Sequence, residues 1–109
     1  MVNLILQATG IPYKETRFLK PPTATSYAIY NDALERRGGD NINLICNHNI
    51  SIELYQYTPD PESEKAIEDQ FDIFGIEYTK DPRYWIQEEQ LYQVIYNFSY
   101  IVKGGLNNV

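Results

Sequence analysis

The last third of the chain alternates between two kinds of side chain. Between Tyr92 and Val102 every second residue is aromatic or β-branched, whereas Gln93, Asn97 and Ser99 stand between them. Successive side chains of a β-strand point to opposite faces of its sheet, so this period of two predicts a long strand with one buried face. A chain with such a strand has to supply neighbouring strands and a cover for the apolar face. The alternating set is Tyr92, Val94, Tyr96, Phe98, Tyr100 and Val102.

The segments before this strand predict its neighbours in the sheet. Ile50, Ile52 and Leu54 alternate with polar residues and indicate a strand with one apolar face. A shorter extended segment is expected from Ile76 to Lys80, and Glu88-Glu89 stand where a turn would lead into the last strand.

A helix is predicted between these strands. Asp60 supplies an N-cap side chain, Pro61 fits the first helical position, and Gly75 suits the left-handed conformation that ends a helix. Apolar residues recur at helical spacing and predict one buried face, whereas the acidic residues are expected on the solvated face. The apolar positions are Ile67, Phe71 and Phe74, and the acidic positions are Glu62, Glu64, Glu68, Asp69 and Asp72.

The first thirty residues have shorter patterns. Val2 to Thr9 carries apolar residues at helical spacing and is followed by Gly10, which predicts a short first helix. Residues 11–18 should be extended. The apolar segment from Tyr27 to Tyr30 should form a short strand that ends at Asn31-Asp32.

The segment from Asp32 to Asn49 is the least regular part of the chain. It contains Gly38-Gly39 and a run of asparagines, so we expect a long polar loop. The alternative is a longer hairpin whose arms reach toward Leu44. Long loops in compact domains often carry function, which makes this segment a candidate for contacts with partners.

These segments predict an α+β fold of one domain. Two helix-then-strand units indicate a two-layer α/β sandwich, in which both helices cover one face of a mainly antiparallel sheet and a long hairpin loop projects from it. The chain has 109 residues, which is enough for one domain with its own core. We place this domain at residues 1–103 and expect residues 104–109 to form a flexible tail.

The composition disfavours several classes of function. The formal net charge is −6 and the nine basic residues are scattered, so binding of duplex nucleic acid by phosphate neutralisation is not expected. The start of the chain lacks the features of a secretory signal, and the single cysteine, Cys46, cannot form an internal disulfide. We therefore expect a cytosolic protein. No apolar run approaches the roughly 20 residues that span a bilayer.

No cluster of residues predicts catalysis or metal binding. Cys46 and His48 could share one strand face, but zinc needs four ligands and the chain has no second Cys or His. The acidic residues of the predicted helix lack the spacing of a calcium loop. We expect no catalytic residues, no metal and no cofactor, and we do not expect an enzyme.

The sheet should instead offer a surface for self-association. Two helices on one side leave the other face of the sheet uncovered, and this face would carry Leu91 and further apolar side chains. Arg36 and Arg37 are the only adjacent basic residues of the polar segment. The candidate interface residues are therefore Arg36, Arg37, Asp40, Tyr55, Tyr57, Ile95 and Ile101.

About the last two-thirds of the chain resembles the tail terminator proteins of long-tailed bacteriophages and prophages, which are also called tail completion or tail-to-head joining proteins. The resemblance lies in an ordered series of predicted strand and helix segments and involves no reactive motif. These segments are Asn47 to Tyr55, Pro61 to Phe74, Gly75 to Tyr78, Tyr84 to Ile86, and Gln90 to Tyr100.

The resemblance implies a structural protein of the virion, in the tail or neck, that is assembled in the host cytoplasm. Such proteins are small α/β domains that form a ring, usually a hexamer, which caps the tail tube and joins it to the head connector. The implied partners are further copies of the chain, the tail tube protein and the connector or stopper protein. DNA would pass through the lumen without specific binding, in keeping with the acidic net charge.

Two alternatives remain open on the sequence. One is a different neck protein, such as a head completion or connector protein, which would bind filled heads and not tails. The other is a small ligand-binding α/β domain with a pocket between sheet and helices, which would need a convergent polar cluster in its core.

Overall fold

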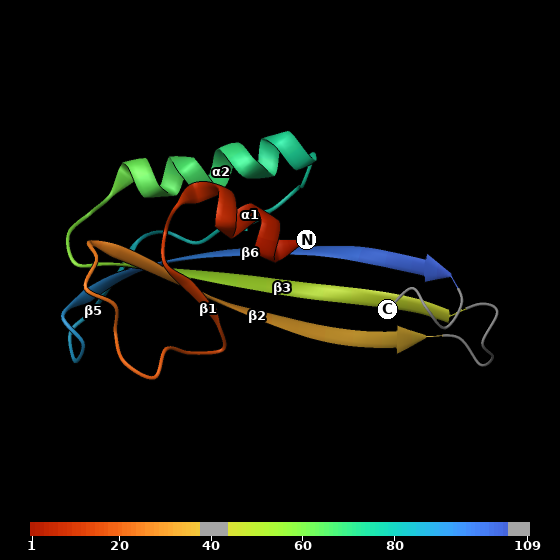
Figure 1. Ribbon diagram of the computed structural model, residues 1–109, viewed down its shortest axis with the longest axis horizontal. Coiled ribbons are helices and arrows are strands. Elements are labelled where there is room, and N and C mark those ends of the chain that lie inside the picture. The colour runs from red at the N-terminus through yellow and green to blue at the C-terminus, as the bar shows by residue number, and fades with distance from the viewer. Residues whose placement is uncertain (38–43, 105–109) are drawn as a thin grey trace.

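The computed structural model describes residues 1–37 and 44–104 of the chain. Two helices and six strands follow one another along these described residues (Figure 1). The helices are α1 (Val2–Thr9) and α2 (Pro61–Phe74), and the strands are β1 (Tyr13–Glu15), β2 (Ser26–Arg37), β3 (Leu44–Gln56), β4 (Thr79–Lys80), β5 (Tyr84–Ile86) and β6 (Leu91–Gly104).

The strands form one sheet in the order β1-β2-β3-β6-β4, and β5 also pairs with β6. Among these six strands β1 and β2 run parallel, and the other pairings are antiparallel. Both helices lie on the same side of this sheet (Figure 1). The predicted α+β fold, with two helices over a mainly antiparallel sheet, is therefore confirmed.

The core lies between the helices and the even-numbered side chains of the three long strands. Ile52, Leu54 and Tyr96 on the sheet and Phe71 on α2 are fully buried. The Phe71 ring contacts the rings of Tyr78, Tyr96 and Phe98, with centroids 4.4, 5.6 and 5.4 Å away. Full burial of each large apolar side chain stabilises the fold by about 1.5–3 kcal/mol. The alternating apolar side chains of β6 that face the helices therefore make a large contribution to the stability of the core.

The predicted helix ends are confirmed. Asp60 caps α2, since its Oδ1 accepts a hydrogen bond from the Ser63 backbone N–H at 3.2 Å, and hydrogen bonds from Ser63 lower the pKa of the Asp60 carboxyl. Gly10 and Gly75 follow the two helices with φ of 75° and 66°. Residues with a side chain rarely adopt this left-handed conformation, which explains glycine at both stops.

The polar segment after Tyr30 differs from the predicted loop. The strand does not end at Asn31-Asp32, because β2 continues to Arg37 and pairs with β3 from Ser26 opposite Gln56 onward. The described parts of the segment from Asp32 to Asn49 are thus the two arms of a long hairpin, as the alternative to a polar loop predicts. Backbone hydrogen bonds hold both arms, so polar side chains are tolerated where a strand face meets water. Residues 38–43 lie outside the described part.

Smaller predictions at the chain ends and at α2 also need correction. Gly104, predicted to begin the tail, is the last residue of β6, and residues 105–109 are outside the described ranges. Phe74 is 40% exposed, because it is the last residue of α2 and extends past the core. The extended segment at Ile76 to Lys80 contributes only the two residues of β4.

The far halves of β2, β3 and β6 extend beyond the helix layer as a three-stranded projection (Figure 1). The molecule measures 48 × 28 × 22 Å along its principal axes. Its elongated shape places the two ends of the sheet far apart, which matters for the surfaces described next.

Candidate interaction surface on the open sheet face

The face of the sheet turned away from the helices carries the odd-numbered side chains of β2, β3 and β6. Cross-strand pairing arranges them in rows. At one end Tyr27, Tyr55 and Gln93 form a row, and Ile29, Glu53 and Ile95 form the next. The two middle rows are uncharged and mostly polar, the row after them contains Glu35, Asn47 and Ile101, and the last row ends at Lys103. The chemical character of this open face therefore changes along the strands.

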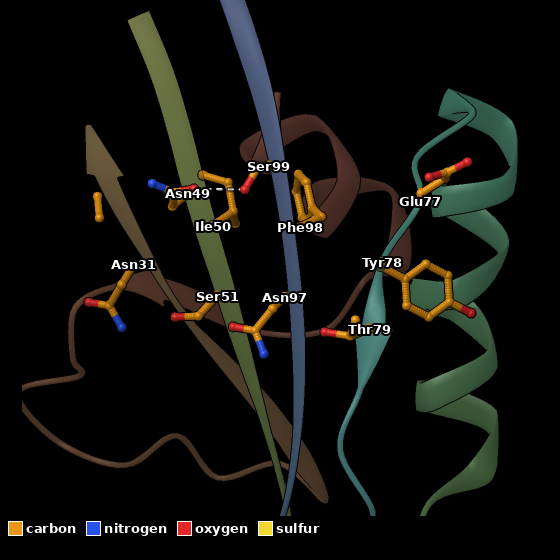
Figure 2. Close-up of a pocket in the computed structure, with 11 residues that line it drawn as sticks. Asn31, Asn49, Ile50, Ser51, Glu77, Tyr78, Thr79, Asn97, Phe98 and Ser99 are labelled. Atoms are coloured by element: carbon orange, nitrogen blue, oxygen red, sulfur yellow. Dashed lines mark hydrogen bonds between the residues drawn. The ribbon is translucent and has the colours of Figure 1, made fainter. Parts of the chain in front are cut away.

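A groove with a volume of about 750 Å³ crosses the middle of the open face. Asn31, Ser51, Asn97 and Thr79 line it from four neighbouring strands (Figure 2). Next to them the Ser99 hydroxyl donates to Asn49 Oδ1 at 2.7 Å. These amides and hydroxyls can donate and accept hydrogen bonds.

The end of the face near Tyr27 is aromatic. The Tyr27 and Tyr55 rings stack at 5.2 Å with an interplanar angle of 23°, and the Phe18 ring meets Tyr27 edge-on at 5.4 Å. A pocket of about 430 Å³ opens beside them and is also lined by Tyr57 and Glu89. Burial raises the pKa of the Tyr27 hydroxyl, and the negative charge of Glu89 raises it further. We call the set of Tyr27, Tyr55, Tyr57 and Glu89 the acidic aromatic pocket.

Glu53 lies half-buried between two isoleucines. Its cross-strand neighbours are Ile29 and Ile95, and burial raises the pKa of its carboxyl, an effect that a hydrogen bond with Tyr55 partly offsets. Within the described part of the chain, neither Glu53 nor Glu89 forms an ion pair. A carboxylate in such surroundings is better stabilised when a cation approaches it.

The predicted interface residues fall into different places. Tyr55, Ile95 and Ile101 share the open face, and Ile101 is 57% exposed. Tyr57 follows the end of β3 and is exposed. Leu91, expected on the same exposed face, is buried.

The two basic candidates belong to β2. Arg36 is exposed and pairs with Cys46, so it lies on the helix side of the sheet. Arg37 is the last residue of β2. Asp40 lies outside the described residues.

Glu64 is the main exception to the predicted solvated face of α2. It is 6% exposed, and its carboxylate accepts from Arg83 Nη2 at 2.6 Å and Gln56 Nε2 at 2.9 Å. Lys80 Nζ lies 2.9 Å from the other oxygen. Burial by itself raises the pKa of Glu64, but these three hydrogen bonds outweigh it, so the pKa is lowered.

This buried polar cluster joins the helix layer to the sheet. Glu68 accepts hydrogen bonds from Lys80 and from the Tyr96 hydroxyl, both at 2.7 Å. Burial and that hydrogen bond raise the pKa of Tyr96. The spacing already contained a signal, because Glu64 precedes Ile67 by three positions and therefore shares its face of the helix. The cluster's charges are paired with one another, so it serves the fold.

Cys46 and His48 occupy the same strand face without forming a metal site. Cys46 is buried, and His48 Nδ1 lies 3.0 Å from the Asp32 carboxylate while the ring stacks on Tyr100 at 4.6 Å. Across the described residues, no three side chains of His, Cys, Asp or Glu come together as metal ligands would. Neither α1 nor α2, the helices of the described chain, is long and apolar enough to cross a membrane.

No protein-family model fits the chain, and no curated protein matches its sequence.

Proposed function

We propose that this protein is a tail terminator of a long-tailed bacteriophage or prophage, which caps the completed tail tube as a ring and joins it to the head connector. The observation that carries the proposal is the open sheet face. It exposes aromatic and apolar side chains at its ends and a polar groove between them, on a molecule whose helices cover only the opposite face.

The order of the structural elements supports the same proposal. The segments that resemble the tail terminator family fall on β3, α2, the segment before β4, β5 and β6. The projecting strands and the open face offer broad surfaces for contacts between copies. The net charge of −6 would keep DNA from sticking to the lumen of a ring.

The test combines native mass measurement with negative-stain imaging. Purified protein is imaged alone and after mixing with tail tubes that lack their terminator, and filled heads without tails serve as the comparison. Rings at the ends of tubes, with no binding to heads, are the expected result. Binding to heads and not to tubes would make the protein a connector, and a monomer that ignores both would refute a role in the neck.

A second candidate function is binding of a small polar ligand in the groove of the open face. Its volume of about 750 Å³ and its lining by Asn, Ser and Thr side chains favour a hydrogen-bonding compound, and Glu77 in the same lining disfavours an anion. A thermal-shift screen of metabolites, with Asn97→Leu as the groove variant, tests this. A compound that stabilises the wild type and not the variant supports it, and a screen with no such compound refutes it.

A further inference from the structure

The projection has an outer edge along β2 that no described strand covers. β1 pairs with β2 at residues 28–30, whereas β2 continues to Arg37. Past residue 30, β2 therefore has β3 on one side and no described strand on the other. An uncovered edge presents unpaired backbone N–H and C=O groups and is a template for pairing with another strand. We call residues 32–36 the β2 edge.

The hydrogen bonds to the β1 segment show which residues of β2 point their backbone groups outward. The Ala28 N–H donates to Pro12 O, and Tyr30 O accepts from the Thr16 N–H, both at 2.9 Å. Along a strand, alternate residues direct their N–H and C=O to the same side, so the even-numbered residues of β2 face outward. Those of the β2 edge are Asp32, Leu34 and Arg36.

The side chains of these three residues lie on one face of the sheet in the order acid, apolar, base. Leu34 is 40% exposed, and Arg36 is exposed and forms no ion pair with a described residue. The Asp32 carboxylate lies 3.0 Å from His48 Nδ1 and is 23% exposed. The order becomes base, apolar, acid when the strand is reversed. A second copy that runs antiparallel therefore brings each acid opposite a base.

We infer that two copies of this chain pair antiparallel through their β2 edges, about a two-fold axis that passes between their Leu34 residues. Asp32 of each copy then lies opposite Arg36 of the other, and the two Leu34 side chains meet at the axis. Residues directly opposite in an antiparallel pair have Cβ atoms about 4.5–5.5 Å apart, and opposite charges at such positions stabilise the pair. The outward backbone groups of both edges form the hydrogen bonds.

The shape of the molecule favours the antiparallel arrangement. The helix layer and β1 lie at the other end of β2 from the projection (Figure 1). A reversed copy keeps its own helices and β1 away from those of the first, whereas a parallel copy would bring β1 against β1 between the two β2 strands. A self-complementary contact of this kind closes as a dimer.

The dimer goes beyond the proposed function and uses a different surface. Even-numbered residues of one copy face even-numbered residues of the other, so the two open sheet faces lie on the same side of the joined sheet. The open face, on which the tail terminator proposal rests, therefore stays uncovered in the dimer.

The outer edge of β6 is the competing site. β4 and β5 pair with β6 at residues 96–97 and 91–93, so its later residues have no described strand on that side. An antiparallel pairing about Ile101 would place Lys103 of each copy opposite Ser99 of the other, without a charge pair. Lysine on an edge strand also disfavours pairing with another chain. The β2 edge is therefore the better contact.

Exchanging the charges tests the pairing of Asp32 with Arg36. Arg36→Asp places like charges opposite each other, whereas Asp32→Arg combined with Arg36→Asp restores opposite charges in exchanged order. Lys20→Asp is the control, because it changes the net charge equally at an exposed position outside the edge. Circular dichroism and thermal unfolding establish that each variant folds, and sedimentation velocity over a range of concentrations measures dimerisation.

We expect the wild type and the control to dimerise alike, and Arg36→Asp to weaken dimerisation at least about tenfold. The double variant should recover to within about threefold of the wild type. A wild type that stays monomeric, an Arg36→Asp variant that dimerises like the control, or a double variant that does not recover would each overturn the pairing.

Cysteine cross-linking tests the register independently. Leu34→Cys places two thiols opposite each other at the axis, within the Cα separation of about 4.4–6.8 Å that a disulfide needs. The controls are Leu19→Cys, at a position that is 91% exposed, and Ile101→Cys on the β6 edge. Cys46 is buried. Under mild oxidation we expect a disulfide-linked dimer of Leu34→Cys and little cross-linking of either control.

The remaining outcomes separate the dimer from the proposed function. Leu34→Cys that cross-links no more than Leu19→Cys overturns the pairing, and cross-linking of Ile101→Cys in its place assigns the contact to β6. Rings at tube ends from a protein that does not pair through β2 would overturn the dimer and leave the tail terminator proposal standing. Dimers that pair through β2 and do not bind tubes would support the pairing and refute the tail terminator proposal.

Discussion

Replacing Glu64 by Gln tests the buried polar cluster directly. The change keeps the size of the side chain and removes its charge. Arg83 and Lys80 then lose a carboxylate partner, at distances of 2.6 and 2.9 Å in the wild type. If Glu64 lay on a solvated helix face, as the sequence pattern suggests, the substitution would hardly change the stability.

The structure allows the size of the effect to be worked out. A hydrogen bond to a charged group contributes about 1 kcal/mol more than a neutral one, so two weakened bonds cost about 2 kcal/mol. Arg83 and Lys80 are about a third exposed, and water compensates part of the loss. We expect a decrease of about 1–3 kcal/mol in the free energy of unfolding, or a fall in Tm of about 8 °C for a loss of about 2 kcal/mol.

Urea unfolding at neutral pH measures this change, with Asp69→Asn as the matched control. Asp69 also belongs to α2 and pairs with Lys65 at 2.8 Å, but both side chains are exposed, so this pair should contribute little. Combining Glu64→Gln with Arg83→Gln should cost less than the sum of the two single changes, because they remove the same contact. The reasoning is refuted if Glu64→Gln costs no more than the control, or if the two changes add.

Four further predictions follow from the same structure. Because the folded-state pKa of Glu64 is lowered, its carboxylate contributes stability above the unfolded pKa of about 4.3, and that contribution is lost as pH falls through the lower folded-state pKa. The free energy of unfolding of Glu64→Gln should therefore depend less on pH between about 7 and 3 than that of the wild type. Parallel curves of unfolding free energy against pH for the two proteins would contradict this. Phe71→Ala should cost about 3–5 kcal/mol in urea unfolding, far more than Phe74→Ala at the exposed end of α2, and equal costs would show that Phe71 does not anchor the core. Gly75→Ala should cost about 1 kcal/mol from backbone strain alone, since nothing lies within 4 Å of the added carbon, and an unchanged urea midpoint would argue against the left-handed conformation. Cys46 is fully buried, so a thiol reagent should label it only after denaturant is added, and rapid labelling of the native protein would contradict its burial.

The elements that were predicted correctly have signals within their own residues. The cap at Asp60, the stop at Gly75 and the period of two from Tyr92 to Val102 each act over a few neighbouring positions. Steric limits and local hydrogen bonds decide such features, so they can be read without knowing the partner strands. The candidate interface residues on the open face, Tyr55 and Ile95, were identified from the same alternation.

The features that were missed depend on pairings between distant residues. β2 continues past Asp32 because β3 pairs with it, and β3 is held by β6 on its other side. Glu64 is buried because Arg83 and Lys80 meet it from a segment beyond the end of α2. A local sequence pattern shows that a residue is charged or that a segment is polar. Whether that residue is buried or exposed depends on residues distant in the sequence that pack against it in the fold.

The amino-acid sequence by itself determined both helices and their ends, the long strand β6, and that one face of the sheet would lack a helical cover, because these follow from periodicity and local backbone chemistry. The tertiary structure alone decided the length of the β2–β3 hairpin, the burial of Glu64, and the placement of Glu53 and Glu89 beside Tyr55 at one end of the sheet with Lys103 at the other. These depend on strand register and on which side chains meet across the fold, and both are set by the free energy of packing the whole domain.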